Sequence, residues 1–486
     1  MISFYACICF ALTEVTVSND ARRINFTMDD PTNGRFDMLS TLPQVEFVIK
    51  NARIDSQTNG TNGGAVFFSN TYWVNPLMRI INCSISRSNA ANGGAVYFNL
   101  AQDMLIENST FFLNTGARGG AAYIQNSRTM RVNKNQFLNC SSSSEGGSLH
   151  INQCYEIMDV KHCLFQSCRT ISNGGAIRIY LDVGIVYFQD CIFNNCSAST
   201  GGAVYIDYNH HRSQIFIDRV CGYMCHAPSS GNFMNFNLGT VYNNITSWIN
   251  MSSINYCSNV QSSSGSIFHS GGNFMISEIN SSFNSASSFS SIYFNPQFEG
   301  TIRYSTIANN SASSYTLYIQ SNMGYKSYMS YCNIFFNTVT SSTSPIIGLI
   351  GKSSSASNGT IIQNCIFYNN QGTLFSIVSY GTHTINDCHI MHNAFYYTIF
   401  TSQSVTVNTN QIIIAISPTI SYKLTHYNTR FCPSAPNIEP QAVTPCPTLP
   451  PLPSTCIIET NSQVSDLGLS SILHFLEKSV YLVLIS

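Results

Sequence analysis

Short stretches of alternating apolar and polar residues recur along this chain, and each stretch follows a pair of glycines. Six segments show the pattern, from NGGAVFF at residues 62–68 to TGGAVYI at residues 200–206. Successive pairs are 30, 26, 27, 28 and 27 residues apart. They are Gly63 with Gly64, Gly93 with Gly94, Gly119 with Gly120, Gly146 with Gly147, Gly174 with Gly175 and Gly201 with Gly202. Such a period predicts one short strand per repeat after the glycines.

A second motif accompanies the glycine pairs. In each repeat an aromatic or aliphatic residue stands three positions before an Asn, Ser or Cys. The clearest examples pair Phe137 with Cys140, Phe165 with Cys168 and Phe193 with Cys196. The motif continues where the glycines fade, as at Ile334 with Asn337. We expect the aromatic residues of successive repeats to stack along a common axis.

Residue size at the turns indicates how the repeats stack. Two glycines permit a positive φ and a close backbone approach where a Cβ would clash with the next repeat. The Asn before several pairs tolerates left-handed geometry and can stack on its counterpart one repeat later. The period is too short for a βαβ unit, and the signature of leucine-rich repeats is absent. The sequence therefore predicts an all-β, right-handed parallel β-helix of about thirteen coils, on the order of 60 Å long at about 4.8 Å per coil.

The chain divides by composition into five segments. The first is apolar, the second carries the most charge, the third holds the repeats, and the fourth is rich in proline and cysteine. No stretch reaches the eighteen or so apolar residues of a membrane-spanning helix. We expect a signal peptide at 1–14 or, alternatively, a buried strand there, an N-terminal cap at 15–61, the β-helix at 62–430, a Pro/Cys-rich linker at 431–460, and a short amphipathic helix or truncated anchor at 461–486.

Charge and composition exclude some function classes. Only 9% of the residues are charged, and 22 basic residues stand against 23 acidic ones. No basic run is able to neutralise a row of phosphates, so nucleic-acid binding is not expected. Hydrophobic residues make up 44% of the chain, enough for a long core. The 18 cysteines favour an oxidising, extracellular compartment.

Aligning the repeats by the aromatic motif places many cysteines in two inward-facing columns. One holds Cys83, Cys163, Cys191, Cys221, Cys332, Cys365 and Cys388, and the other holds Cys140, Cys168, Cys196 and Cys257. Equivalent Cα atoms of neighbouring coils lie about 4.8 Å apart, within disulfide range. Free buried thiols, disulfides between coils and metal ligation all remain open; free thiols are the favoured interpretation.

Candidate catalytic chemistry is sparse. The densest polar cluster is His210, His211 and Arg212, between Asp207 and Asp218, and a solvated turn explains it better than a catalytic site. No GxSxG, HExxH, P-loop or GxGxxG motif occurs. No metal or cofactor is expected.

Asn-x-Ser/Thr sequons number eleven, about as many as this composition produces by chance, so the count decides nothing. We expect the sequons at Asn82, Asn139 and Asn195 to be sterically closed, because they abut inward cysteines.

The motifs G-G-A-[VI], as in NGGAIRI at residues 173–179, and F-x-x-N, as in FFLN at residues 111–114, resemble the chlamydial polymorphic membrane protein repeat, which large surface-protein families of trichomonads share. The resemblance covers about three quarters of the chain. It implies a β-helix displayed on the cell surface and involved in adhesion. Two features depart from that family: Cys often replaces the Asn of F-x-x-N, and the last fifty or so residues are too few for a membrane barrel.

The functional hypothesis is therefore a non-enzymatic scaffold, secreted or on the cell surface, that binds a host-cell or matrix protein or glycan. Contact with a membrane would require an anchor that is not evident in this sequence. A carbohydrate-active enzyme of the pectin lyase type is the alternative, and it would require converging carboxylates. A purely structural coat is a third possibility.

Overall fold

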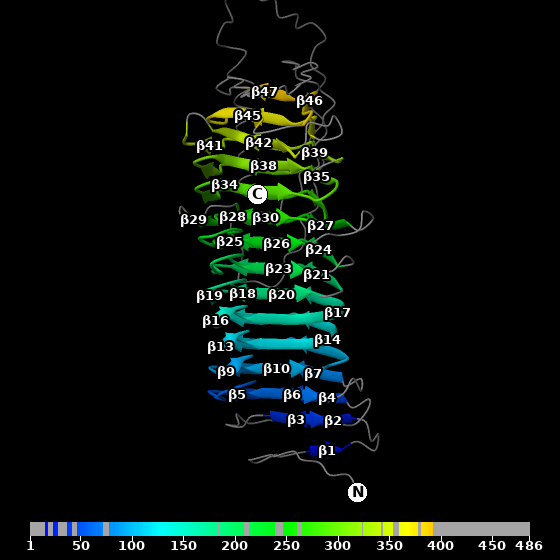
Figure 1. Cartoon of the computed structure of the whole chain (residues 1–486). Coiled ribbons are helices and arrows are strands. Elements are labelled where there is room, and N and C mark those ends of the chain that lie inside the picture. Colours follow the sequence, from blue (N-terminus) through cyan, green and yellow to red (C-terminus); the bar gives the residue numbers. More distant parts are fainter. Residues whose placement is uncertain are drawn as a thin grey trace, which may run out of the picture.

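The described part of the chain forms a single right-handed parallel β-helix, so the predicted fold class is confirmed (Figure 1). The computed structural model describes residues 15–17, 23–27, 36–40, 46–70, 77–181, 184–208, 213–238, 246–259, 265–322, 324–341, 344–352, 359–377 and 381–391. The predicted signal, linker and C-terminal helix, and the last residues assigned to the coils, lie outside these ranges. None of the described segments is a helix long and apolar enough to cross a bilayer.

Each complete coil contributes strands to three sides that run along the rod, and some coils add a strand to a fourth, shorter side. The strands that follow the glycine pairs form the first side, in parallel register from coil to coil. They are β3 (Phe36–Ser40), β6 (Val66–Asn70), β10 (Val96–Asn99), the start of β14 (Ala122–Asn133) and of β17 (Leu149–Lys161), β20 (Ile177–Leu181), β23 (Val204–Tyr208), β26 (Met234–Leu238), β30 (Ile267–Ser270), β34 (Phe289–Asn295), β38 (Tyr315–Ser321), β42 (Pro345–Gly351) and β45 (Thr373–Ile377).

The second side continues from the first, and in β14 and β17 one long strand bends across both. Its strands are β1 (Val15–Val17), β2 (Arg23–Thr27), β4 (Glu46–Lys50), β7 (Leu77–Ile81), β11 (Asp103–Glu107), the ends of β14 and β17, β21 (Ile185–Gln189), β24 (Gln214–Asp218), β27 (Thr246–Asn250), β31 (Asn273–Ser277), β35 (Gly300–Arg303), β39 (Lys326–Ser330), β43 (Gly359–Gln363) and β46 (Thr384–Asn386).

The third side is a 13-stranded sheet of three-residue strands that carry the aromatic motif. It consists of β5 (Arg53–Asp55), β8 (Ser84–Ser86), β12 (Thr110–Phe112), β15 (Gln136–Leu138), β18 (Leu164–Gln166), β22 (Ile192–Asn194), β25 (Cys221–Tyr223), β28 (Ser253–Asn255), β32 (Asn280–Ser282), β36 (Thr306–Ala308), β40 (Asn333–Phe335), β44 (Ile366–Tyr368) and β47 (His389–Met391).

Two four-stranded sheets make the short fourth side. The lower one contains β9 (Asn89–Asn92), β13 (Thr115–Arg118), β16 (Ser141–Glu145) and β19 (Arg169–Thr170), and the upper one contains β29 (Ser258–Asn259), β33 (Ser285–Ala286), β37 (Ser311–Ala312) and β41 (Thr338–Val339).

A residue in the left-handed conformation stands at each end of the third-side strands. On the coil of β18 these residues are His162 (φ 51) and Ser167 (φ 52), and on the next coil they are Asp190 (φ 52) and Asn195 (φ 53). We call the position between the second and third sides the first corner, and the position after the third side the second corner. Since the left-handed region costs most L-residues about 1–2 kcal/mol, the stack must enforce these turns.

The glycine pairs form the turn into the first side. Gly174 has φ 70, a value that favours glycine. A Cβ on Gly175 would lie 1.9 Å from the carbonyl oxygen of Gly202 one coil later, so only glycine fits this backbone approach. The Asn before the pair stacks as expected, since Asn92 donates to Asn62 at 2.9 Å.

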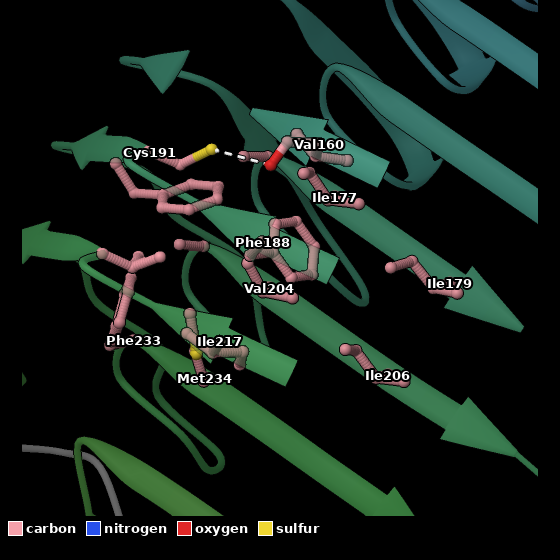
Figure 2. Packing of buried hydrophobic residues seen from close by; sticks show 14 of the residues in the cluster. Val160, Ile177, Ile179, Phe188, Cys191, Val204, Ile206, Ile217, Phe233 and Met234 are labelled. Atoms are coloured by element: carbon pink, nitrogen blue, oxygen red, sulfur yellow. Dashed lines mark hydrogen bonds between the residues drawn. The ribbon is translucent and has the colours of Figure 1, made fainter. Parts of the chain in front are cut away.

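The interior is one continuous apolar core that runs along the axis. Phe111, Phe137, Phe165 and Phe193 stack at centroid distances of 5.0, 4.8 and 4.8 Å, and all four are fully buried. Gly222 occupies the next position, where the Phe233 side chain fills the space that an aromatic residue would take. Figure 2 shows this region, with Phe188, Val204 and Ile217 pointing into the same interior.

The N-terminal segment at 15–61 was expected to cap the rod, but most of its described strands already belong to the coils. Strands β2 and β4 pair in parallel with the second side, and β3 and β5 pair with the first and third sides. Only β1 pairs antiparallel, with β2. The coils therefore begin before the first glycine pair, because apolar alternation alone is enough to build these early strands.

Replacing Gly175 by Ala should destabilise the rod by at least about 3 kcal/mol, because the new Cβ overlaps the Gly202 carbonyl. Gly60→Ala is the matched control, since a Cβ at Gly60 meets nothing within 4 Å. Urea unfolding followed by circular dichroism measures both variants. Equal midpoints for the two variants would contradict the close approach of these coils.

Candidate functional site

The second cysteine column lies inside the rod, at the position directly after the second corner. It contains Cys140, Cys168, Cys196, Cys225 and Cys257, each completely buried. Aligning the repeats by the aromatic motif did not place Cys225 in this column, because its coil carries Gly222 instead of an aromatic residue at the motif position. In other coils the same place belongs to Asn114, Asn284, Asn310 and Asn337, whose amides bond to backbone groups of adjacent coils.

The prediction for Cys221 is wrong. Strand β25 pairs Cys221 with Ile192 and Gly222 with Phe193, so Cys221 faces away from the core and Val220 takes the inward place beside Cys191. A one-residue shift in this coil caused the error. Cys221 is disulfide-bonded. The other cysteines of the first column, including Cys163 and Cys191, are buried, and their thiols point to backbone carbonyls such as that of Val160 (Figure 2).

The twelve other cysteines within the described ranges are free thiols, which agrees with the favoured interpretation. Burial raises the pKa of Cys83 to about 11 and that of Cys154 to about 12. It also raises the pKa of Cys140 well above its usual value. Thiols in this state are protonated at neutral pH, so they pack as small apolar groups and do not act as nucleophiles.

An arginine-centred cluster occupies the first corner, where His162, Asp190 and Arg219 stand on successive coils. Arg219 binds both carboxylate oxygens of Asp190, at 2.6 and 2.9 Å, and contacts Asp218 at 2.5 Å. His162 lies 3.7 Å from Asp190. Burial raises the pKa of Asp218, although the positive charge of Arg219 opposes the shift. Both carboxylates therefore serve as partners of one guanidinium.

A second arginine lies on the outer surface of the first side. Arg178 is only 7% exposed and bridges Glu145 and Asp207, each at 3.5 Å. Its guanidinium carbon lies 4.7 Å from the ring centroid of Tyr205, so it continues an outer column in which Tyr123 stacks on His150 at 4.9 Å. Arginine here takes the place of an aromatic ring.

The carboxylates named in the sequence do not converge. Asp207 lies on β23 of the first side and Asp218 on β24 of the second, and each is bound to a different arginine. Residues 209–212, which include the predicted histidine cluster, lie outside the described ranges. Within the described ranges no three His, Cys, Asp or Glu side chains are grouped to hold a metal ion.

An apolar ridge stands out at the second corner. Met224, Tyr256 and Phe283 occupy this corner on three successive coils and are 48%, 38% and 36% exposed. The rings of Tyr256 and Phe283 stack at 4.9 Å, and Tyr223 meets Tyr256 edge-on at 5.6 Å. We call Met224, Tyr256 and Phe283 the corner ridge. Exposed apolar groups of this kind commonly mark interaction surfaces.

Sequence reasoning missed the corner ridge, although a signal for it exists. The corner residue is the one directly before the Asn or Cys of the aromatic motif, as Met224 is before Cys225 and Phe283 is before Asn284. The same geometry corrects the expectation about glycosylation: Asn82, Asn139 and Asn195 occupy the corners and are exposed rather than closed.

Comparison with protein-family models supports the fold. A family model described as right handed beta helix region matches residues 64–237. The A-module of the mannuronan C-5 epimerase AlgE4 from Azotobacter vinelandii is similar to this chain with a TM-score of 0.31 and 10% sequence identity, over 75% of this chain and 91% of the module. The comparison with curated proteins gives no match.

Native-state alkylation should leave the twelve free thiols unmodified, because burial shields them from the reagent. Treatment with N-ethylmaleimide before and after addition of guanidinium, followed by mass spectrometry, measures the difference. Rapid labelling of Cys168 or Cys191 in the native protein would contradict the packing described above.

His269 makes the rod sensitive to acid. Its side chain is fully buried at an inward position between Phe236 and Phe294, both ring nitrogens lack hydrogen bonds, and burial lowers its pKa to about 3. Because the unfolded histidine binds a proton near pH 6.5, stability is complete above that pH and falls between about 6.5 and 3, by on the order of 5 kcal/mol.

His269→Phe should remove this part of the pH dependence, since phenylalanine fits the same position on both adjacent coils. Urea midpoints at pH 7 and pH 4 measure the effect, and His162→Phe, at an exposed corner, is the control. An unchanged difference between the two midpoints in His269→Phe would show that other groups cause the acid sensitivity.

Proposed function

We propose that this chain is a non-enzymatic β-helix scaffold, secreted or displayed on a cell surface, that binds a protein of a host cell or matrix through the corner ridge. The observation that carries the proposal is the exposure of Met224, Tyr256 and Phe283 on three successive coils of a surface otherwise rich in hydroxyl and amide groups. Buried in an interface, such side chains contribute about 1.5–3 kcal/mol each.

A protein partner suits the corner ridge better than a glycan does. Sugars bind aromatic residues by lying on an open ring face. The rings of Tyr256 and Phe283 instead stack on each other, with only 5° between their planes. Met224 is the most exposed member of the ridge and has a flexible side chain. Aromatic residues and Met are enriched at protein interfaces.

The arrangement of charges supports a binding role over the enzyme alternative. A polysaccharide lyase or hydrolase requires carboxylates or bases free to exchange protons with substrate. In the described coils, Asp190 and Asp218 are held by Arg219, and Glu145 and Asp207 by Arg178. Each of these four carboxylates is therefore engaged in an ion pair with an arginine.

Replacing the ridge by serine should reduce binding to cells or to extracellular matrix protein at least tenfold, with little effect on folding. Serine is chosen because Ser56 and Ser167 already occupy the second corner with positive φ. The variant carries Met224→Ser, Tyr256→Ser and Phe283→Ser together. Solid-phase binding to intact cells measures adhesion, and urea unfolding checks stability.

Leu113→Ser is the matched control, because Leu113 has the same corner position and is 42% exposed but lies four coils below Met224. Binding that survives the triple substitution, or that falls equally in Leu113→Ser, would contradict the assignment of the ridge. Loss of binding after glycosidase treatment of the cells would indicate a glycan partner. Release of sugar fragments from a polysaccharide would favour the enzyme alternative.

A further inference from the structure

Five of the Asn-x-Ser/Thr sequons place their asparagine at a corner of the rod. Asn82 and Asn108 occupy the first corner, and Asn139, Asn195 and Asn309 occupy the second. All five have the positive φ of a corner residue, between 48 and 53. Four of them are exposed, and Asn309 is half-buried. Their place in the fold distinguishes these sequons, although the number of sequons in the chain does not.

The two first-corner asparagines use their side-chain amides to join one coil to the next. The Nδ2 atom of Asn108 donates to the Oδ1 atom of Asn82 at 2.7 Å, and the Nδ2 atom of Asn82 donates to the Oδ1 atom of Asn51 at 3.3 Å. A sugar on either nitrogen would stand in the middle of this amide stack. These two amides therefore serve the packing of the coils.

The three second-corner asparagines have amides that the packing does not use in this way. The Nδ2 atom of Asn195 has one long contact, 3.4 Å to the hydroxyl of Ser167. No hydrogen bond joins the side chain of Asn139 or Asn309 to another residue in the described ranges. A bulky substituent on these nitrogens would therefore extend from the surface without displacing a strong contact.

Two of the second-corner asparagines stand next to the corner ridge. Strand pairing places Asn195 one coil below Met224 and Asn309 one coil above Phe283. Tyr256 lies between Met224 and Phe283 on the intervening coil. The five residues thus occupy consecutive second corners, which span four coil steps of about 4.8 Å, or about 19 Å. The ridge begins and ends beside a sequon.

We propose that Asn139, Asn195 and Asn309 are N-glycosylation sites, and that the glycans on Asn195 and Asn309 stand at the two ends of the corner ridge and keep the ridges of two copies apart. The inference rests on the proposed function in one respect, because the modification requires passage through a secretory compartment. N-linked glycans are bulky and hydrophilic. Two long rods therefore cannot align their ridges, whereas a narrower partner can approach between the two glycans.

The modification transfers an oligosaccharide from a lipid pyrophosphate carrier to the asparagine. A bond forms between Nδ2 and the anomeric carbon of the first sugar, and the bond from that carbon to the pyrophosphate oxygen breaks. Nδ2 gives up one proton, and the lipid pyrophosphate leaves with the bonding electrons, so no oxidant or reductant is required. The nitrogen keeps its second hydrogen, with which Asn195 can still donate to Ser167.

The sequon at Asn250 offers an internal control. Its Nδ2 atom donates to the Oδ1 atom of Asp218 at 3.2 Å, beside the guanidinium of Arg219. The third residue of this sequon, Ser252, is buried, and its hydroxyl donates to the carbonyl of Asn250 at 2.7 Å. A glycan on Asn250 would displace the contact with Asp218, so folded chains should be unmodified there.

Peptide mapping of the full chain tests the sites. The chain is secreted from cultured eukaryotic cells behind an added signal peptide, digested, and treated with peptide N-glycosidase in water labelled with heavy oxygen, which converts each glycosylated asparagine to labelled aspartate. Mass spectrometry should find the label at Asn139, Asn195 and Asn309 in most molecules and at Asn250 in few. Absence of the label at Asn195 or Asn309, or equal labelling at Asn250, would overturn the proposal.

Removal of the sequons tests the effect on the ridge. The variant Ser197→Ala with Ser311→Ala keeps both corner asparagines but should lose both glycans, and self-association measured by light scattering should increase severalfold because apolar surfaces can then meet. Ser141→Ala, which removes only the sequon of Asn139 away from the ridge, is the matched control. Equal self-association of the two variants would contradict shielding of the ridge.

Cell binding by the same preparations separates this proposal from the proposed function. Ridge-dependent binding by a chain that carries no glycans at Asn195 and Asn309 would overturn the glycosylation sites and leave the function in place. Glycans at both positions, together with binding that the serine substitutions of the ridge do not change, would support the sites and contradict the function.

Discussion

The structure depends on the close approach of each coil to the next at the turn into the first side. There the backbone of Gly175 lies so near the carbonyl of Gly202 that a Cβ could not be accommodated, and the same contact recurs at the other glycine pairs. In these coils the contact fixes the register, and strand pairing keeps the same register in coils without a glycine pair, as between β42 and β45. Corners, aromatic residues and thiols form columns as a consequence.

Register explains both the interior and the surface. Inside, identical residues stack, as Phe137 does on Phe165, and each stacked pair contributes about 0.5–1.5 kcal/mol beyond its burial. Outside, charges meet when they stand on the same coil or on adjacent coils. Arg219 therefore reaches Asp190 one coil below, whereas Asp387, at the same corner far up the rod, cannot take part. A rod with so few charges gathers them into local ion pairs and leaves long neutral surfaces.

These surfaces divide into two kinds along the third side. The corner ridge leaves Met224, Tyr256 and Phe283 open to solvent, while Ile192 and Cys221 of the neighbouring outer column are buried. Two adjacent columns of the same side therefore differ in exposure, and only the corner ridge is available to another molecule.

The sequence by itself determined the fold, the strand after each glycine pair and the inward stack of Phe137, Phe165 and Phe193, because a regular period forces equivalent residues into equivalent places. It also indicated that the thiols face inward, since alternation sets the direction of a side chain on a strand. The sequence indicated the wrong column for Cys221 and missed Cys225, because this coil is shifted by one residue relative to its neighbours. A shift of one residue on a strand turns an inward side chain outward, and only the pairing of strands between coils reveals it. Only the tertiary structure decided which residues lie exposed at the corners, which carboxylates share an arginine and which outward residues are buried, because these depend on contacts between coils about thirty residues apart.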